Sequence, residues 1–122
     1  MASSTIGDVD AVAFVALSSG LPDIVLKEYR HWTSITFRGR GFAWVEHQQD
    51  TAMVKSTHAE REAIIGNNPE IFSAGWASRS TAWVSIELAR ADPDELFEIL
   101  ADGWRMTATK KAIAAYDEQQ GL

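Results

Sequence analysis

The stretch TAWVSIELARADPDELFEILADGW (residues 81–104) places a strand next to a helix and decides the fold. Apolar side chains first alternate with others, which is the pattern of a half-buried strand. The apolar positions are Ala82, Val84, Ile86 and Leu88, and the positions between them are Thr81, Trp83, Ser85 and Glu87. Asp92 then offers a helix cap, and Pro93 suits the first helical position. Apolar residues follow at helical spacing, namely Leu96, Ile99, Leu100, Gly103 and Trp104. The stretch therefore predicts a helix lying across a sheet.

Residues 24–56 extend that sheet upstream, because their side chains also alternate with a period of two. Ile35 and Phe37 face one way, and the segment 38–41 (RGRG) forms a tight, basic hairpin turn. A second polar connection at residues 47–50 precedes a strand over 51–56. Short connections between consecutive strands require antiparallel neighbours, since a parallel crossover needs about a dozen residues. We predict a meander of three or four strands.

Helices complete the predicted fold. Helical patterns cover residues 8–18, 58–66 and 110–116, and Thr57 with Glu60 forms a capping box before the second of them. Residues 73–80 suit an exposed loop or a strand margin. The predicted class is α+β, a two-layer fold with an antiparallel sheet meander and helices mainly on one face. We expect a flexible tail over residues 1–7 and one domain over 8–122.

Composition limits the possible classes of function. A chain of 122 residues forms one domain, and the absence of cysteine excludes disulfides, thiolate metal ligands and cysteine nucleophiles. No apolar run approaches the roughly 20 residues that span a bilayer. Residues 1–7 also lack the basic and apolar regions of a signal peptide. We expect a cytoplasmic protein with no membrane partner.

Charge is distributed unevenly along the chain. The net charge is −6, which disfavours diffuse binding to nucleic acid. Residues 24–61 nevertheless carry a net charge of +2, whereas residues 87–102 carry −5. We therefore expect a dipolar molecule.

The best candidate site combines cations with one aromatic residue on the predicted strands and hairpin. Its members are Lys27, Arg30, Trp32, Arg38, Arg40 and Lys55. Guanidinium and ammonium groups on adjacent strands can bind phosphates, while an indole ring stacks on a base or sugar. The alternative is a solvated sheet face with ordinary turn residues.

A second candidate surface comprises Trp76, Arg79 and Trp83. Exposed aromatic residues often mark a surface that binds a protein or a small ligand. The alternative is that a helix or loop covers these side chains. We expect Trp44 and Trp104 to lie in the core.

Catalytic and metal-binding patterns are weak. His58 and Glu62 are spaced to share a metal on one helix face, but capping and dipole roles account for them and no third ligand is evident. The carboxylates at Asp92, Asp94 and Glu95 suit an exposed helix N-terminus. We therefore expect no catalytic residues, no metal and no cofactor.

Several segments carry a resemblance to a known family. The most specific are WVSIEL (83–88), DPDEL (92–96), ADGWR (101–105), KK (110–111) and AYD (115–117), supported by LP (21–22), FRGRGF (37–42) and HAERE (58–62). On these residues the chain resembles the MmcQ/YjbR family of small bacterial proteins over about residues 9–118. The family usually has proline where this chain has Thr109.

The resemblance implies a compact α+β fold. This fold is similar to secretion-chaperone-like and CyaY-like arrangements and to the double-wing domain of a phage transcription activator. The resemblance also implies DNA binding, although fold alone does not fix function. We expect a non-enzymatic DNA-binding protein. The alternative is a module that binds a protein, a small ligand or a second copy of itself.

Overall fold

The computed structural model describes residues 9–121, so the expected tail over residues 1–7 lies outside the described residues. Four α-helices, six strands and one short 3₁₀ helix are present in residues 9–121. In chain order they are α1 (Ala11–Ser18), β1 (Ile24–Glu28), β2 (Trp32–Phe37), β3 (Arg40–Glu46), β4 (Thr51–Ser56), α2 (His58–Asn67), β5 (Phe72–Ala77), β6 (Ala82–Glu87), η1 (Leu88–Arg90), α3 (Pro93–Thr107) and α4 (Lys110–Gln119). None of the helices in this range is long and apolar enough to cross a membrane.

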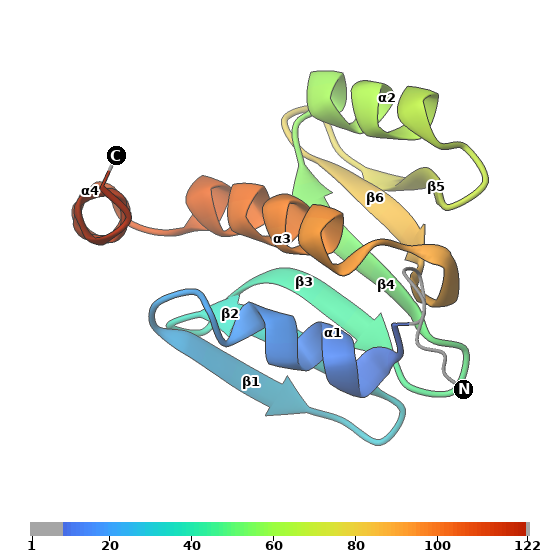
Figure 1. Cartoon of the computed structure of the whole chain (residues 1–122), viewed down its shortest axis with the longest axis horizontal. Coiled ribbons are helices and arrows are strands. Elements are labelled where there is room, and N and C mark those ends of the chain that lie inside the picture. Colours follow the sequence, from blue (N-terminus) through green and yellow to red (C-terminus); the bar gives the residue numbers. More distant parts are fainter. Residues whose placement is uncertain (1–8, 122) are drawn as a thin grey trace.

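The six strands form one sheet in the order β1-β2-β3-β4-β6-β5, with every neighbouring pair antiparallel. The first four strands are the predicted meander. Residues 73–80, which suited a loop or a strand margin, instead supply most of β5. Helix α2 carries the chain from β4 past β6 to this edge strand (Figure 1).

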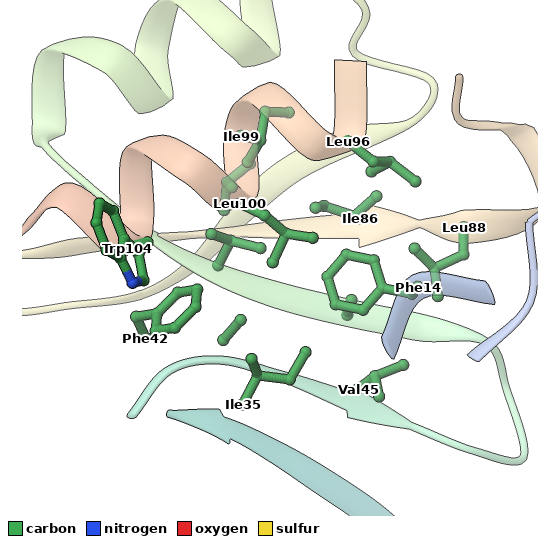
Figure 2. Packing of buried hydrophobic residues seen from close by; sticks show 14 of the residues in the cluster. Phe14, Ile35, Phe42, Val45, Ile86, Leu88, Leu96, Ile99, Leu100 and Trp104 are labelled. Carbon is green, nitrogen blue, oxygen red and sulfur yellow. The ribbon is translucent and has the colours of Figure 1, made fainter. Parts of the chain in front are cut away.

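Helices α1, α2 and α3 cover one face of the sheet, which confirms the predicted α+β class (Figure 1). Helix α1 lies beside α3, and α3 packs on β3 and β4. Helix α2 covers β5 and β6, where Ile64 and Ile65 pack against the core. Figure 2 shows residues of α1 and α3, such as Phe14 and Leu100, packing over strand residues such as Ile35 and Ile86.

The helix boundaries follow the capping residues seen in the sequence. The Asp92 side chain accepts a hydrogen bond from the Glu95 backbone N–H at 3.3 Å, and Pro93 opens α3. Thr57 and Glu60 form the predicted capping box of α2. Thr109 caps α4 through the Ala112 N–H at 3.1 Å, so the absence of a proline does not prevent the break between α3 and α4.

The second face of the sheet is not covered by any helix within residues 9–121. It carries the side chains at the alternate positions of each strand, among them Trp44, Met53 and Trp83, which are half-buried. The prediction that Trp44 belongs to the core is therefore wrong, whereas Trp104 is fully buried as expected. A period-two pattern does not separate the covered face from the bare one when both carry large apolar residues.

Neutralising Asp102 of α3 and Asp117 of α4 should change the stability of the protein in opposite directions. Partial burial and the nearby Glu60 raise the pKa of Asp102, so its carboxylate destabilises the folded state above that pKa. We expect Asp102→Asn to raise the urea midpoint at pH 7 and to lose this advantage as the pH falls through the raised pKa of the wild-type carboxyl. Much of the Asp102 side chain remains in contact with water in spite of its partly buried carboxyl, and water screens these effects, so the gain should stay below about 1 kcal/mol.

The matched variant is Asp117→Asn. A hydrogen bond from Arg105 lowers the pKa of Asp117, so its carboxylate stabilises the folded state above the ordinary aspartate pKa. This variant should lower the urea midpoint at pH 7, and the deficit should shrink as the pH falls through the lowered pKa. Equal shifts of the same sign in both variants would contradict the assignment.

Candidate nucleic-acid interface

One end of the sheet brings together segments that are far apart in the sequence. Strand β2 ends there and β3 begins, β4 also ends there, and α3 finishes over the same region before α4 starts. Figure 1 shows α4 beyond the end of α3, on the side away from the start of α1. This end of the sheet therefore brings together side chains as far apart in the sequence as Lys27 and Lys111.

The β2–β3 turn is a tight turn of two residues, Arg38 and Gly39. Arg38 and Gly39 both have positive φ, 50° and 100°, as the central residues of a tight hairpin turn require. The Arg38 guanidinium donates to Asp23 Oδ2 from Nε at 3.0 Å and from Nη2 at 2.7 Å. It also lies 4.8 Å from the centre of the Phe37 ring. Both partners are exposed, so this ion pair orients Arg38 and offsets part of its charge.

Two lysines reach the same end from the strands. Lys27 Nζ, on β1, lies 3.3 Å from the Gly39 carbonyl oxygen in the turn. Lys55 Nζ, at the end of β4, lies 3.5 Å from Thr107 Oγ1 at the end of α3. Arg40 begins β3 directly after the turn and is exposed. These cations surround the turn on three strands.

The end of α3 and the start of α4 add the remaining cations. Arg105 near the end of α3 forms an ion pair with Asp117, which fixes α4 against α3. Lys110 and Lys111 lie in the first turn of α4 and are exposed. A depression of about 340 Å³ separates α4 from the β2–β3 turn, and its lining includes Asp23, Arg38 and Lys111.

We call this region the basic end. Its members are Lys27, Arg38, Arg40, Lys55, Arg105, Lys110 and Lys111. They are most of the 11 lysines and arginines in the chain. Asp23 and Asp117 pair with two of the arginines, while the other five cations form no salt bridge within residues 9–121.

Carboxylates gather at the opposite end of the sheet. There, the Ala11 N–H at the start of α1 donates to Asp50 Oδ1 at 2.9 Å, and the Leu88 N–H after β6 donates to the Asp50 carbonyl oxygen at 3.1 Å. The acidic residues around these contacts are Asp10, Glu28, Glu46, Asp50, Glu70, Glu87, Asp92, Asp94 and Glu95. The fold therefore gathers cations at one end of the sheet and carboxylates at the other, but the separation is partial. Asp102 and the nearby Glu60 lie close to the end of α3, and Asp23 and Asp117 lie at the basic end as well.

The structure divides the first predicted set of residues. Lys27, Arg38, Arg40 and Lys55 belong to the basic end. Arg30 lies in the β1–β2 turn at the other end of the strands, and Trp32 opens β2 there. Trp32 stacks on Tyr29 with ring centres 4.3 Å apart and meets the edge of Trp44 at 6.0 Å.

The second predicted surface lies on β5, β6 and their connecting turn. A bulge sets Gly75 and Trp76 of β5 opposite the single residue Trp83 of β6. Arg61 of α2 donates to the carbonyl oxygens of Gly75 at 3.1 Å and Trp83 at 3.4 Å, so it satisfies acceptors beside this bulge. Trp76 is 65% exposed and Arg79 is exposed in the turn, whereas Trp83 is half-buried on the bare face.

Sequence reasoning missed Arg105, Lys110 and Lys111. The adjacent Lys110 and Lys111 at a helix start were a visible signal, but more than half the chain separates them from Arg38. No spacing rule relates residues so far apart, and only the packing of α4 beside the hairpin turn joins them.

Other sites fit a phosphate ligand poorly. The larger depression, of about 570 Å³, lies between α1 and the first strands, and its lining includes Asp10, Glu28 and Asp50 but no lysine or arginine. Within the described part of the chain, no group of three or more histidines and carboxylates could hold a metal ion.

An antiparallel sheet with helices on one face and cations gathered at one end defines a small α+β domain. The chain belongs to the YjbR family, whose family model matches residues 15–106. This confirms the resemblance drawn from the sequence motifs.

The solved structures support the fold. The chain is similar to the crystal structure of Deinococcus radiodurans protein DR2400, which carries a DUF419 domain. The TM-score is 0.70 at 16% identity, with 95% of this chain and 91% of that chain covered. Comparison with curated proteins gives no match.

Proposed function

We propose that this protein binds DNA without catalysing a reaction and that the basic end contacts the phosphates. The supporting observation is the segregation of charge. Five cations that form no salt bridge within residues 9–121 lie at one end of a molecule whose net charge is −6, and they are Lys27, Arg40, Lys55, Lys110 and Lys111. An acidic opposite end repels the phosphate backbone and so orients the protein during encounter.

The arrangement suits phosphates because its cations come from rigid elements. Arg40 and Lys55 lie on neighbouring segments of the sheet, and the Thr109 cap and the Arg105–Asp117 pair hold the first turn of α4 in position. Phosphate contacts fix position and carry no base sequence, so this end alone predicts binding that is largely independent of sequence. Such binding falls steeply with salt because it releases counterions from the DNA.

The double variant Arg40→Ala/Lys111→Ala tests the proposed interface. We expect the slope of log affinity against log salt concentration to become shallower by about two units, since each lost contact removes about 0.9 on duplex DNA. Fluorescence anisotropy of a labelled duplex of about 30 base pairs, between about 50 and 200 mM salt, measures the slope.

Arg90→Ala is the matched control, because Arg90 pairs with Glu70 at the other end of the sheet. It should leave the slope unchanged. The double variant removes two charges and the control removes one, so a change in slope for Arg90→Ala about half that of the double variant would show that only net charge matters. That result would reject the assigned interface.

A second candidate function is protein recognition through Trp76, Arg79 and Trp83. The exposure of Trp76 favours it, since a large ring 65% exposed on an edge strand is typical of contact residues. If a folded protein fails to bind DNA at either salt concentration, this second function gains support.

A further inference from the structure

The bare sheet face continues directly from the basic end. Cross-strand partners point to the same side of an antiparallel sheet, and the register pairs Trp44 with Met53 and Lys55 with Trp83. The register thus starts the Lys55 side chain on the bare face, while its amine reaches round to Thr107 Oγ1 at the end of α3. The face thus holds two tryptophans and a methionine next to a cation.

Lys27 lies on the same face of the sheet, on strand β1. It pairs with Ser34 of β2, and Ser34 pairs in turn with Trp44 of β3. Its amine extends toward the β2–β3 turn, as the contact with the Gly39 carbonyl oxygen shows. Lys27 on β1 and Lys55 on β4 thus lie on strands to either side of β3, which carries Trp44, and both amines lie toward the basic end.

The opposite margin of the face is acidic. Glu46 pairs with Trp32 and with Thr51, and Glu87 pairs with Thr51 as well, so both carboxylates share the row farthest from the hairpin turn. A polyanion crossing the face is therefore confined to the half nearest the basic end.

We propose that this half of the bare face takes single-stranded nucleic acid, with bases stacking on Trp44 and Trp83 and the backbone following Lys27 and Lys55. The proposal rests on the proposed function and specifies its substrate. Aromatic side chains on an open sheet stack on unpaired bases, whose ring faces are accessible. In a duplex those ring faces are already stacked, so a duplex can use only the cations.

Three probes separate stacking from charge. They are an oligothymidine of about 12 nucleotides, a duplex of the same length, and an abasic strand that carries the same phosphates without bases. We expect the wild-type protein at about 50 mM salt to bind oligothymidine about tenfold more tightly than the duplex or the abasic strand. Fluorescence anisotropy of a terminal label gives the three affinities.

Trp83→Ala and Trp83→Phe provide the matched variants. Trp83→Ala should weaken oligothymidine binding about tenfold and leave duplex binding unchanged, because it removes the ring but no cation. Trp83→Phe keeps an aromatic ring, so it should retain most of the affinity. Circular dichroism confirms that both variants are folded.

The outcomes distinguish the inference from the function on which it rests. Equal binding of the duplex, the abasic strand and oligothymidine, with no effect of Trp83→Ala, would overturn the single-strand inference and leave DNA binding through the basic end in place. Binding of none of the probes by the folded protein would overturn both.

Discussion

Trp104→Ala should lower the free energy of unfolding by about 3–5 kcal/mol, because it deletes the largest fully buried side chain of the protein. The ring lies at the junction of three elements. Its centre is 6.0 Å from that of Phe37 on β2 and 5.2 Å from that of Tyr116 on α4. The Nε1–H also donates to the Pro22 carbonyl oxygen at 3.0 Å, and this acceptor would lose its partner.

Urea denaturation at pH 7 measures the loss, and Trp76→Ala is the control. Trp76 is 65% exposed, so the same truncation there should change the free energy of unfolding by no more than about 0.5 kcal/mol. Similar losses in the two variants would contradict the core position of Trp104. The comparison holds if both variants keep the wild-type m value.

Trp104 also connects stability to the basic end. Its contacts with Phe37 and Tyr116 join the strand before the hairpin turn to α4, which carries Lys110 and Lys111. If Trp104→Ala still folds, β2 and α4 are held together less firmly. This variant should therefore bind duplex DNA more weakly even though no cation is lost. This follows from the need to hold phosphate contacts on rigid elements.

The sequence predicted those parts of the fold that local rules govern. The Thr57–Glu60 box and the Asp92-Pro93 start fixed two helix beginnings, and the short connections between strands fixed the antiparallel meander. Strand β5 was ambiguous, because Gly75 and the bulge at Trp76 break its alternation. Its pairing depends on β6, which no local pattern reveals.

The candidate site was less accessible to sequence reasoning than the fold. The sequence predicts Arg38 and Arg40 together because both lie in the RGRG turn (38–41), and it groups Arg30 with them as a cation of the same predicted strands. The structure places Arg30 at the far end of the strands, because a β-strand carries the chain about 3.3 Å per residue. Lys111 lies near the hairpin turn instead, because α4 packs beside that turn.

Gly103→Ala should lower the free energy of unfolding by about 1–3 kcal/mol, although alanine is the better helix former by about 1 kcal/mol. Gly103 lies where α3 crosses β4. A Cβ atom there would lie 2.9 Å from Val54 Cγ1 and 3.0 Å from the Lys55 carbonyl oxygen. The backbone oxygen belongs to a central strand and cannot move without disturbing the sheet, so α3 would have to rise from its position.

Gly66→Ala in α2 is the matched control for Gly103→Ala. A Cβ atom at Gly66 meets nothing within 4 Å, so only the helix propensity changes and the variant should gain up to about 1 kcal/mol. Thermal or urea unfolding of both variants should give shifts of opposite sign. A gain at both positions would mean that α3 does not approach β4 as closely as the structure shows. Because Lys55 follows Val54 on β4, a displaced α3 would also separate Lys55 from Thr107, so the salt dependence of DNA binding should change in Gly103→Ala and not in Gly66→Ala.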